Sequence, residues 1–91
     1  MQNGEENKAV RISDEQWDAV ERLIPLLGKE HEWEVSTNRH HERCLWEREE
    51  DAPFWPDEAL RALRGALTKP LKDYALSAED VRLLEPLFLG D

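Results

Sequence analysis

The fold of this chain is decided most clearly by the stretch ISDEQWDAVERLIPLLG, which occupies residues 12–28. Ser13 is a good helix N-cap residue, and Gln16 three residues later completes the sequence pattern of a capping box. The apolar residues that follow recur at helical spacing and form one stripe: Trp17, Val20, Leu23, Ile24 and Leu27. Because Pro25 removes a backbone donor, we expect the helix to kink or to end one turn before Gly28.

The C-terminal stretch, residues 76–90, follows the same scheme. Ser77 is the expected N-cap and Asp80 stands in the capping-box position. An apolar stripe at helical spacing follows the cap: Val81, Leu84, Leu87 and Phe88. We expect Pro86 to interrupt this second helix and Gly90 to close it.

A third helix is predicted from about residue 57 to residue 68. Pro56 suits a helix start and Pro70 follows its end. One face of this segment carries three leucines: Leu60, Leu63 and Leu67. Gly65 weakens the helix by roughly 1 kcal/mol relative to alanine.

Residues 29–51 show the alternation of a β-strand. Apolar or bulky residues at every second position, His31, Trp33, Val35 and Thr37, alternate with Glu32, Glu34 and Ser36. We expect Cys44 and Trp46 to face the first set from a second strand, with residues 38–41 as the turn. A helix over about residues 39–50 is the alternative. The predicted fold is therefore mainly α (α+β), with about three short amphipathic helices and a two-stranded antiparallel hairpin within residues 30–48.

Composition limits the class of protein. The chain has 91 residues, which is one small domain; we expect a flexible N-terminal tail over residues 1–11 and a single globular domain over residues 12–91. Acidic residues number 21 against 12 basic residues, a net charge of −9, which argues against direct binding of nucleic acid or of an anionic membrane. Cys44 is the single cysteine, and no signal peptide or membrane-spanning stretch is evident, so we expect a cytoplasmic protein.

Three side chains are weak candidates for a metal site: His31, His40 and Cys44. Their spacing matches no standard zinc pattern, and a fourth ligand would have to be a carboxylate. No nucleophile–base pair and no phosphate-binding glycine loop stands out in the sequence. We therefore expect no catalytic residues, no cofactor and no enzyme activity.

The proline-flanked run of residues 53–56 holds Phe54 and Trp55 in a stiff segment. Both rings either cap the core or form an interface anchor, and the sequence leaves both interpretations open. Acidic side chains cluster on either side of the predicted turn, and with the two rings they make up the candidate partner-binding set: Glu30, Glu32, Glu34, Glu47, Glu49, Glu50, Asp51, Phe54 and Trp55.

The functional hypothesis follows from this charge. A small acidic protein can occupy the basic, nucleic-acid-binding surface of a partner by imitating an array of phosphates. Anti-CRISPR and anti-restriction proteins of phages, immunity proteins and antitoxins share this physical profile. The alternatives are a self-associating helical domain with structural or regulatory function, in which a homodimer covers the apolar helix ends, and a module stabilised by a metal bound to the His/Cys cluster.

Overall fold

The computed structural model describes residues 11–28 and 30–89, which form helices and an antiparallel sheet in one mixed α+β fold, as predicted. The elements follow in the order α2 (Asp14–Leu23), η1 (Ile24–Leu27), β1 (Trp33–Thr37), β2 (Arg43–Glu47), β3 (Ala52–Pro53), α3 (Pro56–Ala66), η2 (Leu71–Asp73) and α4 (Ala78–Leu89). Apart from Arg11, the tail predicted over residues 1–11 lies outside the described residues.

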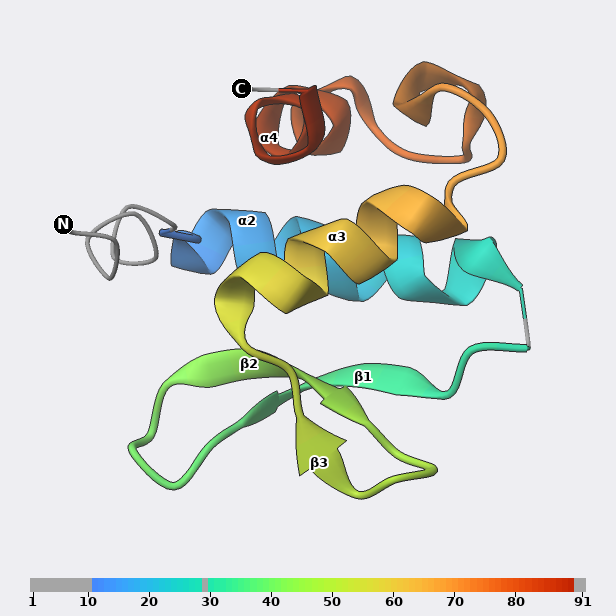
Figure 1. Cartoon of the computed structure of the whole chain (residues 1–91). Coiled ribbons are helices and arrows are strands. Elements are labelled where there is room, and N and C mark those ends of the chain that lie inside the picture. The colour runs from blue at the N-terminus through green and yellow to red at the C-terminus, as the bar shows by residue number, and fades with distance from the viewer. Residues whose placement is uncertain (1–10, 29, 90–91) are drawn as a thin grey trace, which may run out of the picture.

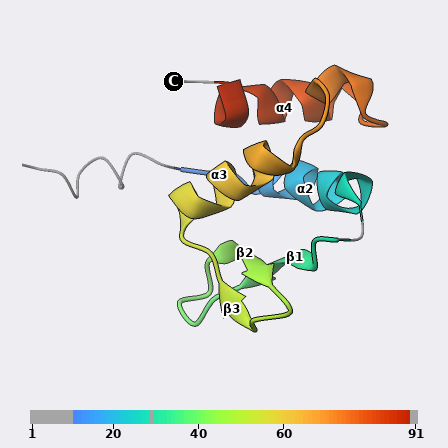
Figure 2. The ribbon, with the colours of Figure 1, turned by 45° about the vertical axis from the view of Figure 1, so that its right-hand side comes forward.

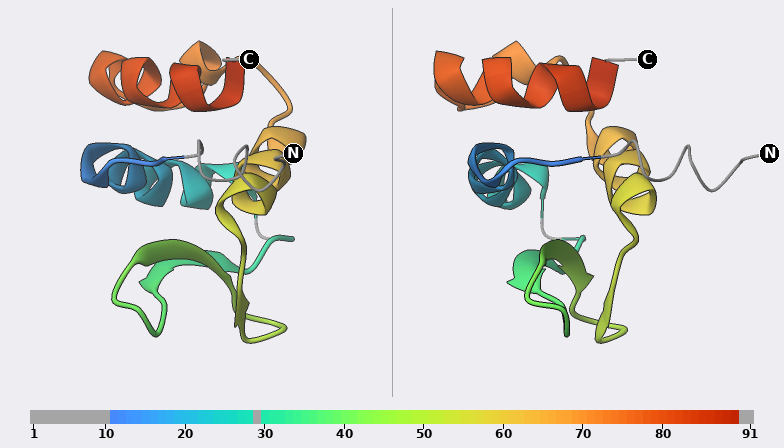
Figure 3. Two further views of the ribbon diagram at one scale, coloured as in Figure 1. Left: turned by 60° about the vertical axis from the view of Figure 1, so that its left-hand side comes forward. Right: turned by 90° about the vertical axis from the view of Figure 1, so that its left-hand side faces the viewer.

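These elements stack in three layers (Figures 1 and 2). The sheet is the lowest layer, α2 and α3 lie side by side above it, and α4 covers the two helices from the other side (Figure 3). The core fills the space between the layers with side chains from all of them: Trp17, Ala19, Val20, Leu23, Leu27, Leu45, Ala59, Leu63, Leu71, Tyr74, Leu84 and Phe88.

The first helix forms as its sequence predicts. Ser13 Oγ accepts a hydrogen bond from the backbone N–H of Gln16 at 3.1 Å, and Gln16 Oε1 accepts one from the backbone N–H of Ser13 at 2.9 Å. The α-helix ends at Leu23, and the segment that contains Pro25 continues as the 3-10 helix η1. Gly28 then turns the chain with a φ of 104°, a conformation that L side chains rarely adopt.

The C-terminal helix α4 differs from its prediction at two positions. Ser77 Oγ caps the helix by accepting from the backbone N–H of Asp80 at 3.1 Å, but the Asp80 carboxylate pairs with Arg22 of α2 instead of closing a capping box. The helix also continues through Pro86, where an interruption was predicted. Leu84 and Phe88 on either side of the proline are buried at 0% and 4% exposure, and this packing outweighs the one lost hydrogen bond. The predicted stop at Gly90 lies outside the described residues.

The predicted hairpin is present, but the prediction of which β2 side chains share a face with Trp33 and Val35 is wrong. Val35 pairs with Leu45, whereas Cys44 and Trp46 pair with Ser36 and Glu34 on the face turned away from the helices. The expectation that Cys44 and Trp46 face Trp33 and Val35 is therefore wrong, and so is the alternative helix over residues 39–50. A third strand, β3, pairs with β2 and was not predicted.

The turn between β1 and β2 is closed by Asn38. Its Oδ1 accepts from the backbone N–H groups of His40 at 2.8 Å and Glu42 at 3.1 Å. His41 completes the turn in a left-handed conformation with a φ of 65°. Local side-chain chemistry therefore places the turn where the sequence predicts it.

The helix α3 begins at Pro56 and ends at Ala66, two residues before its predicted end. After it, the backbone N–H of Thr68 donates to Tyr74 Oη at 2.9 Å, and Lys69 Nζ lies 4.8 Å from the centre of the Tyr74 ring. Hydrogen bonds from Thr68 and the charge of Lys69 lower the pKa of the Tyr74 hydroxyl against the opposing effect of its desolvation. These contacts fix the connection from α3 to η2, so that Tyr74 enters the core.

Candidate protein-binding surface

The hairpin brings the two predicted acidic groups together. Glu32 and Glu34 lie beside the turn that follows β2, because the backbone N–H of Arg48 donates to the carbonyl oxygen of Glu32 at 2.8 Å. Arg48 Nε lies 4.0 Å from Glu34 Oε1, so one cation sits between the acidic strand and the acidic turn. Glu30, Glu32, Glu34 and Glu49 are all exposed, so these carboxylates lie at the surface.

A shallow pocket of about 270 Å³ opens where β2 and β3 meet the start of α3. We call it the turn pocket; its lining consists of Glu47, Glu50, Ala52, Pro53, Phe54 and Glu58. Three acidic residues from two separate segments thus line one pocket together with an aromatic residue. Glu58 was missed in the sequence, where it is one of several acids in a helical first turn and has no pattern linking it to Glu47 or Glu50.

The aromatic side of the turn pocket is held rigidly. Glu47 Oε1 accepts a hydrogen bond from Trp33 Nε1 at 2.8 Å. The Trp33 ring stacks on His31 with centroids 4.3 Å apart and meets Phe54 edge-on at 5.9 Å. Phe54 itself is half-buried: it packs against the core and also lines the turn pocket, so the structure is compatible with both interpretations of this ring.

Trp55, the next residue, behaves differently. Its side chain is 72% exposed, and its backbone N–H donates to Glu58 Oε1 at 3.3 Å. The ring cannot point inward together with Phe54, because consecutive residues of an extended segment face opposite ways. For Trp55 the core interpretation is therefore wrong, and a large apolar ring stands in solvent beside the turn pocket.

Asp51, the last acid of the predicted set, has a structural contact as well. It occupies a left-handed conformation with a φ of 55°, and its Oδ1 accepts from Trp46 Nε1 at 3.3 Å. The contact ties the turn back to the outer face of β2. Asp51 is still exposed, so its charge remains at the surface.

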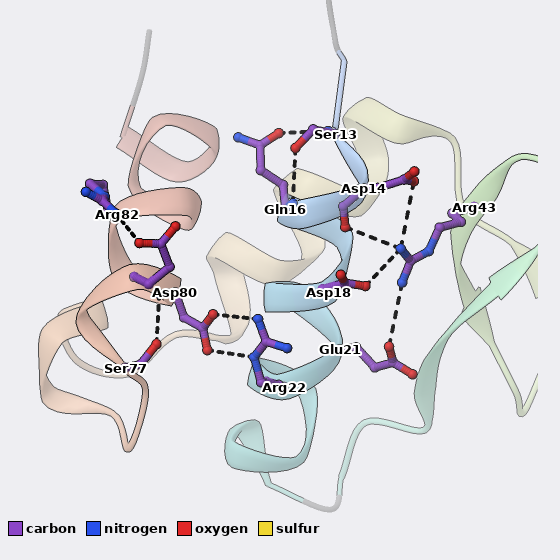
Figure 4. A network of polar contacts seen from close by, with 11 residues as sticks. Ser13, Asp14, Gln16, Asp18, Glu21, Arg22, Arg43, Ser77, Asp80 and Arg82 are labelled. Atoms are coloured by element: carbon purple, nitrogen blue, oxygen red, sulfur yellow. Dashed lines mark hydrogen bonds and ion pairs between the residues drawn. The ribbon is translucent and has the colours of Figure 1, made fainter.

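The acidic face of α2 is different, because it surrounds a cation (Figure 4). Arg43 of β2 lies 3.0 Å from Asp18, 3.6 Å from Glu21 and 3.8 Å from Asp14. A larger pocket of about 540 Å³ at this end of α2 also mixes Arg11 and Arg43 with acidic side chains. Opposite charges partly cancel here, so this face attracts a basic partner less than the turn pocket does.

Asp80, also shown in Figure 4, is the one buried acid among residues 11–28 and 30–89. It accepts from Arg22 Nε at 2.7 Å and from Arg22 Nη2 at 2.6 Å, a bidentate pair that joins α4 to α2. Hydrogen bonding from Arg22 holds the pKa of the Asp80 carboxyl below its ordinary value, against the opposing effect of its desolvation. This charge stabilises the fold and is not available to a partner.

The three metal candidates are not assembled. His31 and His40 lie beyond opposite ends of β1, and Cys44 lies in β2 with its side chain buried. Burial raises the pKa of the Cys44 thiol, which disfavours the thiolate that metals bind. Within residues 11–28 and 30–89, no group of three or more His, Cys, Asp or Glu side chains is placed to hold a metal ion, and this includes the carboxylates of the turn pocket.

The self-association hypothesis depends on the apolar helix ends, and in the described part of the chain these ends are partly buried. Leu27 and Phe88 are buried, and Leu26 is 37% exposed. Among the described residues, Trp55 is the other large exposed hydrophobic residue, and its backbone N–H donates to an acidic side chain, Glu58. No helix among the described residues is long and apolar enough to cross a membrane.

The comparisons with other proteins add no homologue to this picture. No protein-family model, no curated protein and no solved structure matches the chain. The class that the fold and surface define is a small α+β domain with an acidic, aromatic surface beside its sheet.

Proposed function

We propose that this protein binds a basic surface of a partner protein and acts by that binding, without catalysis. The observation that carries the proposal is the turn pocket, which Glu47, Glu50 and Glu58 line together with Phe54, the residue before the exposed Trp55. The pocket combines negative charge with apolar area, which is what a lysine or arginine side chain requires: the charged head meets carboxylates while the stem packs on a ring.

The exposed ring supports binding in a second way. Trp55 lies between a half-buried Phe54 and the first helical residue, Pro56, so its backbone is held before a partner arrives. A preorganised tryptophan loses little conformational entropy on binding, and tryptophan is among the residues most often found at interface hot spots. We expect acidic residues to speed association and Trp55 to slow dissociation.

The partner that fits this surface best is a nucleic-acid-binding protein in the cytoplasm. Its basic site would otherwise hold phosphates, and the carboxylates of the turn pocket and of Glu32 and Glu34 take their place. Inhibitors of this type include anti-CRISPR and anti-restriction proteins, immunity proteins and antitoxins. The net charge of −9 further supports attraction to such a site.

The test compares two triple variants in a co-purification from extract of the source cells, followed by mass spectrometry. Glu47→Gln, Glu50→Gln and Glu58→Gln together remove three negative charges from the turn pocket. The matched control removes three from α2: Asp14→Asn, Asp18→Asn and Glu21→Gln.

The proposal expects a nucleic-acid-binding protein to be recovered with the wild type and the α2 variant, but not with the pocket variant. Added DNA or RNA should compete with the wild-type protein for that partner. Recovery of no nucleic-acid-binding protein contradicts the proposal, and equal recovery with both variants moves the binding site away from the turn pocket.

A further inference from the structure

One edge of the sheet carries backbone groups without partners. The strand order is β1-β2-β3, so β1 is an outer strand. Hydrogen bonds from Arg48 N–H to the Glu32 carbonyl and from Asn38 N–H to the Glu42 carbonyl fix which residues of the strand bond to β2. In an antiparallel pair, residues that bond to the partner strand alternate with residues whose backbone groups point away from it. The backbone N–H and C=O groups of the even-numbered residues of β1 therefore point toward β2, and those of the odd-numbered residues point outward.

The outward-facing backbone groups belong to Trp33, Val35 and Thr37. Within the described residues, no backbone hydrogen bond from another element reaches them. The side chains of Trp33 and Val35 pack against the core but stay half-buried. The edge of the five-residue strand β1 therefore presents the unused donors and acceptors of three residues together with uncovered apolar area.

The opposite edge of the sheet is unsuited to pairing. β3 has two residues, and one of them is Pro53, which lacks a backbone N–H. Short strands and prolines are devices by which proteins prevent unwanted pairing at an edge. The β1 edge has neither device, and carries acidic side chains instead: Glu30, Glu32 and Glu34.

We propose that the β1 edge accepts an extended segment of the basic partner as a fourth strand. This inference rests on the proposed function and names how the partner binds. Strand addition gives affinity through main-chain hydrogen bonds and specificity through alternate side chains. The segment alternates apolar residues, which pack beside Trp33 and Val35, with lysine or arginine residues, which lie beside Glu32 and Glu34.

Charge selects this occupant over a second copy of the chain. Two copies would each bring a net charge of −9 and the same acidic strand to the contact. Like charges on neighbouring strands destabilise pairing, whereas opposite charges across the strands stabilise it. A basic strand therefore fits the edge better than the protein's own β1.

The first experiment titrates the full-length protein with a blocked eight-residue peptide of alternating valine and lysine. Amide hydrogen exchange is measured by NMR, with an alternating valine–glutamate peptide as the control. We expect the lysine peptide to slow exchange at Trp33, Val35 and Thr37, while Glu34 and Ser36, already bonded to β2, change little. The glutamate peptide should change none of these amides.

The second experiment removes one outward donor. Thr37 is exposed and ends β1, so Thr37→Pro deletes its N–H without removing a bond to β2. We expect Thr37→Pro to weaken peptide binding roughly fivefold or more, the effect of one lost hydrogen bond. The matched variant Thr37→Ala keeps the N–H and should bind as the wild type does, and unchanged thermal unfolding of both shows that the sheet is intact.

Three results overturn the inference. If the lysine peptide binds without protecting the outward amides, strand addition is ruled out, but the proposed function is not. If no binding is detected even at high peptide concentration, the β1 edge is ruled out as a docking site. Protection of the same amides by raising the protein concentration alone, with a dimer in light scattering, assigns the edge to a second copy.

Discussion

Replacing Asp80 with asparagine is expected to lower the free energy of unfolding by about 2 kcal/mol near pH 7. The carboxylate is 4% exposed and accepts two hydrogen bonds from Arg22, at 2.7 and 2.6 Å. Hydrogen bonds to charged groups contribute about 1.5–3 kcal/mol, and the exposure of the Arg22 side chain keeps the value below that of a fully buried pair. For a domain of this size the loss corresponds to a fall in Tm of roughly 10 °C.

The effect depends on pH in a defined direction. Arg22 holds the pKa of Asp80 below its ordinary value of 3.8, so the folded protein gives up this proton more readily than the unfolded chain. The stability that the charge contributes is complete well above pH 3.8 and is lost as the pH falls through the lower pKa of the folded state. The difference between wild type and Asp80→Asn should therefore be full near pH 7 and should shrink below pH 3.8.

Urea unfolding followed by tryptophan fluorescence, near pH 7 and near pH 3, measures both effects. Glu79→Gln is the matched control, because Glu79 pairs with Arg82 at the surface of the same helix and should change stability by less than about 0.5 kcal/mol. Equal losses in the two variants would refute the assignment of Asp80 as the stabilising acid. A loss in Asp80→Asn that stays the same near pH 3 would refute the charge as its cause.

Four further changes test other parts of the structure. Leu45→Ala should lower the free energy of unfolding by about 3 kcal/mol in urea, since the side chain is 0% exposed; a loss below about 1 kcal/mol contradicts its place in the core. Gly65→Ala should raise stability by about 0.5–1 kcal/mol, because an added Cβ meets nothing within 4 Å inside α3; a lower Tm would contradict this. Trp55→Ala should leave unfolding within about 0.5 kcal/mol of the wild type but weaken partner binding roughly thirtyfold, and the opposite pattern would place the ring in the core. Arg43→Ala should destabilise the protein by about 1 kcal/mol at low salt through repulsion among the α2 carboxylates, and about 1 M salt should remove most of that loss; a salt-independent loss would point to packing instead.

The helices were predictable because their signals are local. The Ser13–Gln16 capping box and the position of Pro25 lie within the segment that they organise, and the structure has both as expected. Pro86 shows the limit of such signals. The same residue type ends α2 but is tolerated in α4, because Leu84 and Phe88 on either side of Pro86 are buried in the core that the other elements build.

The sheet was predictable only in part. Alternation shows which residues of one strand share a face, but it does not say which face of the next strand meets them. That choice depends on the turn closed by Asn38, which pairs Val35 with Leu45 and sends Cys44 to the other side. The two-residue strand β3 has no alternation at all, so no pattern in the sequence reveals it.

The candidate site could also be predicted only in part, because sequence patterns reveal residues that are close in the chain and not those that the fold brings together. The run of acids and the proline-flanked pair Phe54 and Trp55 are features of one short segment, so the sequence identifies them, but the exposure of Trp55 had to come from the structure. Glu58 joins Glu47 and Glu50 only because α3 begins beside the turn, which is a tertiary fact. Asp80 was assigned to a capping box since its true partner, Arg22, lies 58 residues away.

The acidic side chains behind the net charge of −9 are therefore of two kinds: some stabilise the fold, and others are the ones that we propose bind a partner. Asp80 is neutralised inside the structure by Arg22, and the acids of α2 surround Arg43. Among the described residues, no ion pair joins a carboxylate of the turn pocket to a cation. The exposed Trp55 follows Phe54 of this pocket in the chain, and the same sheet carries the open edge of β1. Because binding energy comes from charge and apolar area together, the side of the molecule that carries the sheet, and not the acidic helix α2, is where we expect a basic partner to bind.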